Sequence, residues 1–279
     1  MRLIRYGPLG REAPGLWQED KIIDLRAVFP EIPDIGETFF RDGWLQRIEA
    51  IEQTGKRMDV RIGCPIYRPS KIICLGLNYL DHKEESGFEI PQKPLLFCKT
   101  QNALAGPFDP IVFPQSCSQI DWEVELAVVI GREGKRIRAE DALQYVAGFT
   151  VMNDVSGRDA QFFDSQWFRG KSMDTFAPLG PALVTVDEVE NFGNLKLTAS
   201  VNEELMQSGN TADMIFDIPS IIAFISEDIT LVPGDIISTG TPSGVGFFRD
   251  PPVLLKAGDT VECWVEHIGS IRNVVKTGS

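Results

Sequence analysis

The sequence predicts an α+β fold that is rich in strands, with a small N-terminal domain ahead of a larger domain. Short apolar segments that are typical of strands dominate the chain after residue 70. Helical segments are few, and they do not alternate regularly with strands as they do in a parallel βαβ fold. Proline and glycine are frequent before residue 40, which indicates a small unit with many turns. We therefore predict domains at residues 1–68 and 69–279.

The N-terminal domain is expected to contain two short strands and one helix. Apolar residues favour strands over residues 3–6 and 21–25, and their spacing favours a helix over 44–53. The sequence Arg68-Pro69-Ser70 then breaks the pattern and leads into the first strand of the larger domain, at residues 71–76.

The larger domain is expected to contain mostly strands with short helices between them. Its predicted helices cover residues 79–86, 139–144, 157–168 and 219–226. Its further predicted strands cover residues 95–99, 122–130, 147–153, 182–186, 196–201, 236–239 and 261–267.

Composition limits the partners and the kind of site. The net charge of −13 argues against nucleic acid and against an anionic membrane surface, because both require a basic face. We expect no signal peptide and no membrane span, and the odd number of cysteines without CxxC pairing favours reduced thiols in a cytoplasm. With only two histidines, a zinc site built on histidine and cysteine is disfavoured. Any metal would depend on carboxylates, which suit Mg²⁺, Mn²⁺ or Ca²⁺.

Two glutamates, Glu123 and Glu125, are separated by a single residue in the apolar segment 122–130. On a strand they share one face, together with Ala127 and Val129. The face could be solvated, but its apolar continuation favours carboxylates at the open end of a strand buried on both faces. Burying two like charges costs on the order of several kcal/mol, and a divalent cation is the simplest compensation.

Two further charged residues follow later in the chain. Asp154 ends the predicted strand 147–153, where it could bind a cation with the two glutamates or merely cap a turn. Lys171 lies within a stretch that is otherwise rich in apolar residues, glycine and proline. It could be an ordinary surface lysine, or it could stabilise negative charge on a substrate beside the carboxylates.

Two other segments are weaker candidates. His82 and Glu85 are three residues apart, so a short helix would place them on one face as a pair able to take a proton from water. Taken alone, the pattern favours an exposed helical turn over such a pair. The glycine-rich loop 238–246 lacks the phosphate-loop pattern of nucleotide-binding proteins, but it permits close backbone approach to a small anion.

Five motifs, taken in order, resemble the fumarylacetoacetate hydrolase superfamily from residue 70 onwards. They are LNYLDHKEESG, DWEVELAVVIG, NDVSGRDAQ, GKSMDTFAPLGP and STGTPSGVG. The chain is similar to bacterial members such as the 2-hydroxyhepta-2,4-diene-1,7-dioate isomerase-like, 2,4-diketo-3-deoxy-sugar-acid hydrolase-like and acylpyruvase-like proteins. The resemblance implies a mixed β-roll that assembles as a homodimer.

The same resemblance implies a set of site residues. Glu123, Glu125 and Asp154 match the ligands of Mg²⁺ or Mn²⁺, for which Ca²⁺ could substitute, and Lys171 matches the active-site lysine. His82 and Glu85 match a dyad on a lid that positions the attacking water. The residues that match substrate-binding positions are Arg158, Gln161 and Thr241.

The function that follows as an expectation is hydrolysis of the C–C bond of a 2,4-dioxo acid to pyruvate and a carboxylic acid, in the catabolism of aromatic compounds or sugar acids. The alternatives on the same scaffold are an oxaloacetate-type decarboxylase, a 2-hydroxydienoate isomerase and a ureidoglycolate-type lyase. Decarboxylation of oxaloacetate and isomerisation of a 2-hydroxydiene acid need the same stabilised enolate, without a hydrolytic water. A non-catalytic binding protein is a further alternative, but it would have no need for a costly carboxylate cluster.

Overall fold

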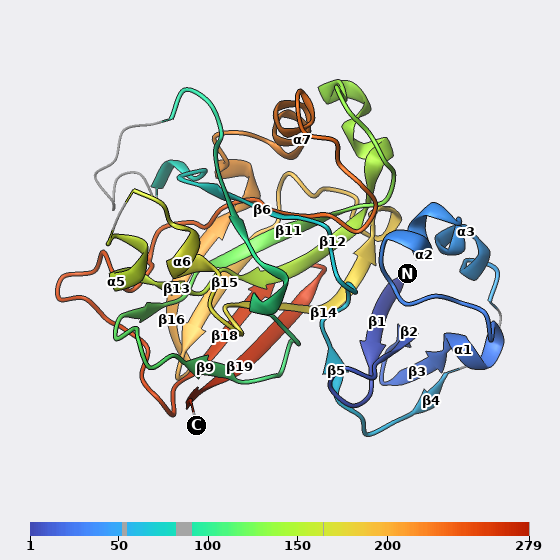
Figure 1. The fold of residues 1–279 in the computed structure, drawn as a ribbon, viewed down its shortest axis with the longest axis horizontal. Helices are drawn as coiled ribbons and strands as arrows, with labels where there is room; N and C mark the ends of the chain where they lie inside the picture. The colour runs from blue at the N-terminus through green and yellow to red at the C-terminus, as the bar shows by residue number, and fades with distance from the viewer. Residues whose placement is uncertain (52–54, 82–90, 164, 279) are drawn as a thin grey trace.

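The computed structural model describes residues 1–51, 55–81, 91–163 and 165–278. Within these residues a large mixed sheet of twelve strands runs through the molecule (Figure 1). Its strands, in spatial order, are β4 (Lys56–Arg57), β3 (Lys21–Asp24), β2 (Ala13–Gln18), β1 (Arg2–Tyr6), β14 (Ala177–Thr185), β12 (Val146–Asn153), β11 (Val124–Ile130), β17 (Ile236–Ser238), β6 (Ile72–Gly76) and β7 (Leu95–Lys99), while β5 (Ile62–Gly63) pairs with β1 and β8 (Leu104–Ala105) pairs with β14.

A second sheet packs against the middle of the first one. Strands β15 and β18 of this sheet contact β11, and its strand β19 contacts β12 and β14, so that both sheets share one apolar core. In spatial order it consists of β16 (Glu204–Asn210), β15 (Lys196–Val201), β18 (Thr260–Val265), β19 (Gly269–Thr277) and β9 (Ile111–Phe113). A separate pair of short strands, β10 (Ile120–Asp121) and β13 (Ser156–Gly157), lies beside the ends of β11 and β12.

The helices among the described residues are short and lie around the sheets. The α-helices are α1 (Leu25–Val28), α2 (Glu37–Arg41), α3 (Trp44–Ile48), α5 (Arg158–Gln161), α6 (Phe168–Lys171) and α7 (Ile218–Ser226). The 3-10 turns are η1 (Gln101–Ala103), η2 (Ala139–Tyr145), η3 (Val186–Glu188) and η4 (Thr211–Asp213). None of the described helices is long and apolar enough to cross a membrane.

Helix α7 shows how local sequence signals set an element. The Asp217 side chain caps its N-terminus by accepting a hydrogen bond from the backbone N–H of Ser220, and Pro219 occupies the first turn, where no N–H donor is needed. Isoleucines at helical spacing are buried on one face. These signals explain why the prediction for residues 219–226 is confirmed almost to the residue.

Strand β11 is the centre of the fold. Its sequence, VELAVVI, is buried at every position, because β12 and β17 pair with its two edges while β15 and β18 pack on one face. β-Branched residues suit such a strand, since they fill a pleated surface with little loss of side-chain freedom. A glutamate inside this segment is therefore held in place by the rest of the core.

The N-terminal region joins the rest of the protein through its first strand. Strand β1 pairs with β14 in the register Leu3↔Leu183, and the helices α1–α3 lie beside it at the right of Figure 1. The guanidinium of Arg61 also binds Asp109, across the expected boundary. Since the large sheet continues from one region into the other, the boundary at residue 68 stays a prediction.

The strand-rich α+β class is confirmed, but one predicted helix is wrong. Residues 157–168 form no continuous helix; α5 ends at Gln161 and α6 begins at Phe168. A Cβ atom added at Gly170 would lie 2.5 Å from the backbone nitrogen of Gln161, so α6 packs directly against the end of α5. In one continuous helix those two residues would be about 13 Å apart.

Candidate metal centre

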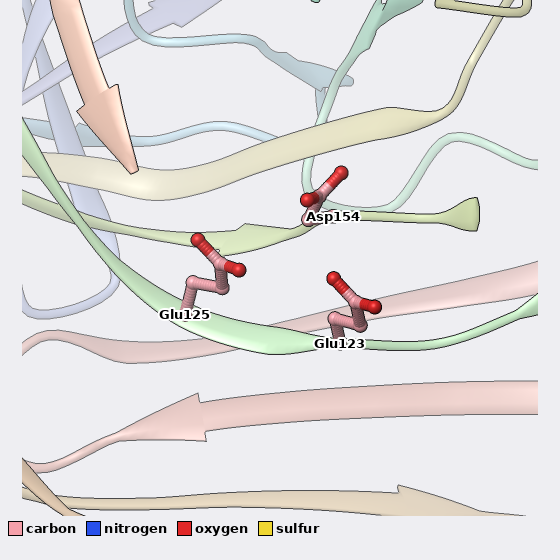
Figure 2. A group of neighbouring side chains, drawn as sticks. All are labelled: Glu123, Glu125 and Asp154. Carbon is pink, nitrogen blue, oxygen red and sulfur yellow. The ribbon is translucent and has the colours of Figure 1, made fainter. Parts of the chain in front are cut away.

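Three acidic side chains converge at the end of β11 (Figure 2). Carboxylate oxygens of Glu123, Glu125 and Asp154 all lie within 4.8 Å of one another, and the three residues are 6%, 1% and 0% exposed. The backbone N–H of Asp154 donates to the carbonyl of Glu123 over 2.9 Å, and the N–H of Glu123 donates to the Asn153 side chain over 3.1 Å. These contacts tie the end of β12 to the start of β11, and thus bring the third carboxylate beside the first two.

The spacing fits a hard divalent cation. Two oxygens bound to the same Mg²⁺ or Ca²⁺ at about 2.1–2.5 Å can lie no more than about 4–5 Å apart. The three carboxylates meet this limit, and they supply the oxygen donors that such ions prefer. The residues present therefore fit Mg²⁺, Mn²⁺ or Ca²⁺, and they contribute three of the six or more ligands that these ions take, which leaves positions for a substrate.

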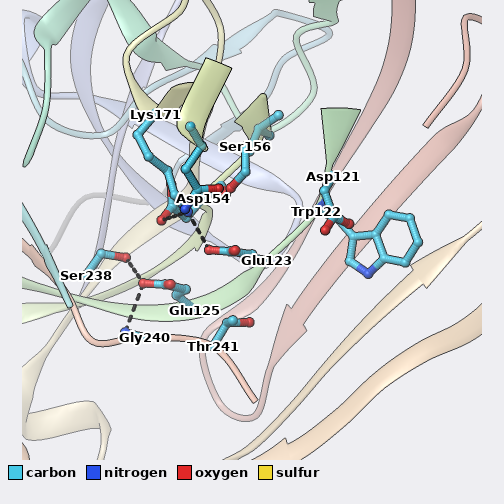
Figure 3. A network of polar contacts seen from close by, with 12 residues as sticks. Asp121, Trp122, Glu123, Glu125, Asp154, Ser156, Lys171, Ser238, Gly240 and Thr241 are labelled. Carbon is cyan, nitrogen blue, oxygen red and sulfur yellow. Dashed lines mark hydrogen bonds and ion pairs between the residues drawn. The ribbon is translucent and has the colours of Figure 1, made fainter. Parts of the chain in front are cut away.

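Two buried lysines neutralise much of the acidic charge. The ammonium of Lys171 lies 2.7 Å from Oε2 of Glu123 and 2.8 Å from Oδ2 of Asp154 (Figure 3). Burial alone would lower the pKa of Lys171, but the charges of Asp154 and Glu123 outweigh it and raise that pKa above its usual value. Lys99, at the end of β7, donates to Oδ1 of Asp154 and to the Val155 carbonyl. Desolvation by burial dominates there, so the pKa of Lys99 is lowered.

Arg158 at the start of α5 provides a third buried cation. Its guanidinium binds Oδ2 of Asp121 through Nε and Nη2, at 2.9 and 2.7 Å, and Nη2 also lies 2.7 Å from Oε1 of Glu123. Its Nη1 donates to the amide oxygen of Gln161 over 2.9 Å. Burial alone would lower the pKa of Arg158, but the charges of Asp121 and Glu123 raise it further above its usual value, so the guanidinium stays charged.

Glu125 is held by the loop that follows β17. Its Oε2 accepts hydrogen bonds from the Ser238 hydroxyl and, over 3.0 Å, from the backbone N–H of Gly240 (Figure 3). Gly240 adopts a φ of +95°, which favours glycine and aims this N–H at the carboxylate. Since both donors bind Oε2, Oε1 is the oxygen that can face a cation. Burial, followed by the charges of Asp154 and Glu123, raises the pKa of Glu125 well above its usual value.

The charges of the cluster leave one carboxylate in excess. Four acidic groups face three basic groups, and all of these residues are buried. An uncompensated buried charge is costly, so the excess favours either a bound proton or a cation. The acidic groups are Asp121, Glu123, Glu125 and Asp154, and the basic groups are Lys99, Arg158 and Lys171.

A pocket opens onto the carboxylates. Its polar lining consists of Glu123, Glu125, Arg158, Gln161, Lys171 and Thr241. Its apolar lining consists of Leu75, Leu77, Phe97, Phe162, Trp167 and Phe248. A ligand of this pocket would thus contact both charged groups and apolar side chains.

The structure brings together most of the residues predicted for the site. The three proposed metal ligands, Lys171 and the three proposed substrate-binding residues all line or contact this pocket, while their individual roles stay predictions. His82 and Glu85 lie outside the described residues. The other histidine, His267, belongs to a surface hollow with Asp187 and Glu266, not to the pocket.

Sequence reasoning missed four residues of the cluster. Asp121 precedes Glu123 by two positions, so strand alternation extended by one step could have indicated it. Lys99 and Ser238 are the last residues of strands β7 and β17, which pass the site, and Gln207 lies on β16 of the five-stranded sheet. Ser238 begins the glycine-rich loop 238–246, but no local pattern indicates its contact with Glu125 or marks Lys99 and Gln207, because only the arrangement of strands brings them to β11.

Comparisons with known proteins agree with this geometry. Residues 71–276 match the family described as fumarylacetoacetate (FAA) hydrolase C-terminal. Oxaloacetate tautomerase Fahd2a of Rattus norvegicus, a mitochondrial protein, is 44% identical over 286 residues, which cover 99% of this chain and 91% of the relative.

Solved structures of enzymes also share the whole fold. A fumarylacetoacetate hydrolase from Exiguobacterium antarcticum is 36% identical, and a maleylpyruvate hydrolase from Sphingobium sp. SYK-6 is 33% identical. Both have a TM-score of 0.83, and each match covers 100% of both chains. The fold, the buried acidic triad and these matches lead to one conclusion: the chain belongs to the fumarylacetoacetate hydrolase family.

Proposed function

We propose that this protein is a divalent-metal-dependent enzyme that interconverts the keto and enol forms of a small 2-oxo acid, with oxaloacetate as the first candidate. The observation that carries the proposal is the Lys171 ammonium, which bridges two of the three carboxylates in a buried pocket. The relative that is 44% identical along the chain, an oxaloacetate tautomerase, supports the same reaction.

Keto–enol interconversion passes through an enolate, whose negative charge must be stabilised. A divalent cation on Glu123, Glu125 and Asp154 would act as a Lewis acid toward the 2-oxo oxygen and lower the energy of that enolate. Lys171 holds a proton beside the same carboxylates, because its pKa is raised. It can therefore donate a hydrogen bond to developing negative charge in a site that largely excludes water.

Arg158 and Gln161 would orient the substrate. The amide oxygen of Gln161 accepts a hydrogen bond from Arg158, so its NH₂ group is the part left to donate. Gln161 lines the pocket near the carboxylates, where this donor could contact a substrate carboxylate. Arg158 adds a permanent positive charge that favours an anionic ligand.

The test is to follow enol absorbance after adding oxaloacetate to EDTA-treated enzyme, with and without Mg²⁺ or Mn²⁺. We expect acceleration that requires the metal, is lost in Lys171→Met and survives in His82→Asn. Equal rates with and without metal, or full activity of Lys171→Met, would reject the proposal. Surface Lys276→Met is the matched control.

Hydrolysis of a 2,4-dioxo acid is the second candidate. It is favoured by the 33% identity to the maleylpyruvate hydrolase over the full length. This reaction needs an activated water as well as the enolate site, and so depends on the proposed dyad of His82 and Glu85. Glu85→Gln should then abolish release of pyruvate from acylpyruvates while tautomerisation continues. Product identification by mass would separate hydrolysis from decarboxylation and lyase activity, and NMR would distinguish tautomerisation from isomerisation, since neither changes the mass.

Assembly and location complete the proposal. A homodimer, expected from the family resemblance, would appear as twice the chain mass in light scattering. The cytoplasm stays the prediction from the cysteines, although the rat relative is mitochondrial. Fractionation of the native cells would decide between the two compartments.

A further inference from the structure

Strand β11 loses the partner on one of its two edges where the carboxylates begin. Strand β17 pairs with β11 only from Val129↔Ile236 to Ala127↔Ser238. The peptide groups of Val124, between Glu123 and Glu125, lie beyond that pairing. Strand β12 still pairs with the other edge here, in the register Val124↔Asn153, but a buried edge without hydrogen-bond partners is costly, so other groups must bind the Val124 N–H and carbonyl on the β17 side.

Two side chains take the place of the missing strand. The hydroxyl of Thr241 donates to the Val124 carbonyl over 2.8 Å, and the amide oxygen of Gln207 accepts from the Val124 N–H over 3.0 Å. These side chains also bind each other, since Nε2 of Gln207 donates to the Thr241 hydroxyl oxygen over 2.8 Å. The second hydrogen of that amide is donated to the Pro242 carbonyl over 2.8 Å.

Gln207 is unusual for its position. It lies on β16, an outer strand of the five-stranded sheet, where its neighbours Leu205 and Ser208 are exposed, yet it is itself only 1% exposed. An amide is the side chain that can accept from Val124 and donate to both Thr241 and Pro242. Glutamate would lose the donors, and leucine would lose all three hydrogen bonds.

The same contacts constrain Thr241. A hydroxyl has one hydrogen, and Thr241 gives it to the Val124 carbonyl while Gln207 binds its oxygen. This hydroxyl is therefore not available to donate to a substrate, although Thr241 matches a substrate-binding position in the family resemblance. Thr241 lies on the loop of Ser238 and Gly240, which bind Glu125 (Figure 3).

We infer that Gln207 and Thr241 form a single positioning unit that fixes the Val124 peptide and thereby the spacing of the Glu123 and Glu125 carboxylates. The inference rests on the proposed function of these two glutamates as metal ligands. Neither member of the unit belongs to the three carboxylates that would hold the cation. Each acts through the backbone of β11, as groups behind a metal ligand do when they set its orientation.

The experiment measures two properties: the Mn²⁺ affinity, by calorimetry, and kcat and KM for oxaloacetate. The proteins compared are the wild type, Gln207→Leu, Gln207→Glu, Thr241→Val, Thr241→Ser and the Gln207→Leu/Thr241→Val double variant. We expect Gln207→Leu and Thr241→Val each to weaken Mn²⁺ binding about tenfold or more. The double variant should be no weaker than either single one, because the two residues act together. Thr241→Ser keeps the hydroxyl and should restore the affinity, and Ser208→Ala is the control on the same strand.

A direct role of Thr241 in substrate binding would give a different pattern of Mn²⁺ affinity and KM. If Thr241 binds substrate directly, Thr241→Val raises KM at unchanged Mn²⁺ affinity and Gln207→Leu does not reproduce it; that outcome overturns the inference. Should Gln207→Leu fail to fold, Gln207→Glu and Thr241→Val, whose folding circular dichroism can check, answer the same question. Absence of Mn²⁺ binding by the wild type would instead reject the proposed metal site itself.

Discussion

The ammonium of Lys99 is completely buried and donates a hydrogen bond to Oδ1 of Asp154. The other oxygen of that carboxylate binds Lys171, so each of its oxygens faces its own ammonium group. The two lysines come from β7 and α6, which lie far apart in the sequence. This arrangement explains how a buried acidic cluster can keep its geometry before a cation binds.

Replacing Lys99 by methionine should destabilise the protein and increase its dependence on metal. Removal of one partner from a buried ion pair costs about 3–5 kcal/mol, because the remaining charge is left without compensation. In EDTA the variant should therefore melt well below the wild type, and Mg²⁺ should raise its melting temperature by more than it raises that of the wild type. Thermal unfolding followed by circular dichroism measures both shifts. Exposed Lys276→Met is the control, and equal melting temperatures in EDTA would contradict the role of Lys99.

Replacing Gly76 by alanine should disturb the apolar lining of the pocket without changing the metal ligands. A Cβ atom there would lie 2.6 Å from Cζ3 of Trp167, so the indole must move. That ring packs edge-on against Phe97 at 5.4 Å, and both rings line the pocket. Because small misplacements in an active site are costly, kcat/KM should fall about 10-fold or more, while Mn²⁺ affinity stays constant.

The control for this change is Gly193→Ala, where a Cβ atom meets no atom closer than 4.0 Å. Steady-state kinetics with oxaloacetate and with a longer acylpyruvate would show whether the rings of Trp167 and Phe97 select substrates by size. Unchanged kinetics for both substrates would mean that the Trp167 ring does not contact the substrate.

The acid stability of the protein should depend on Glu12. Burial alone would raise the pKa of this carboxyl, but the hydrogen bond from Arg61 at 2.8 Å and the charge of Arg5 lower it below 4.5. A group whose pKa is lowered by folding stabilises the folded state above its unfolded pKa, and this contribution is lost as the pH falls through the folded value. Glu12→Gln should therefore lower the free energy of unfolding at pH 7 by about 1–3 kcal/mol.

The difference between this variant and the wild type should shrink as the pH falls below about 4, where the wild-type carboxyl also becomes neutral. Urea unfolding at pH 7, 5, 4 and 3 measures this difference, and exposed Glu31→Gln serves as the control. A difference that is constant with pH would show that the charge of Glu12 does not contribute to stability.

Alternation and turn signals were sufficient to predict much of the site. Glu123 and Glu125 share a strand face, Asp154 follows a strand end, and the structure places all three within 4.8 Å of one another. Their proximity could be anticipated because the relevant patterns lie within a few residues of chain, while their role as metal ligands stays a prediction. The apolar strands 95–99, 196–201 and 236–239 are confirmed for the same reason.

Long-range pairing explains what could not be predicted. Strand β2 contains Pro14 and Gly15, which locally indicate a turn, but pairing with β1 and β3 makes the segment a strand. Lys99 and Gln207 have ordinary sequence surroundings, and they reach the cluster only because β7 and β16 lie at its sides. A strand order that is absent from the local sequence therefore decides these contacts.

The central claim is that Glu123, Glu125 and Asp154 bind one divalent cation. Calorimetric titration of Mn²⁺ into EDTA-stripped, dialysed protein tests it most directly, with Glu125→Ala and the control Glu31→Ala titrated in parallel. The account predicts one Mn²⁺ per chain in the wild type and in Glu31→Ala, and at least a hundredfold weaker binding in Glu125→Ala. A wild type that binds no Mn²⁺, or a Glu125→Ala variant that binds it with wild-type affinity, would contradict the account.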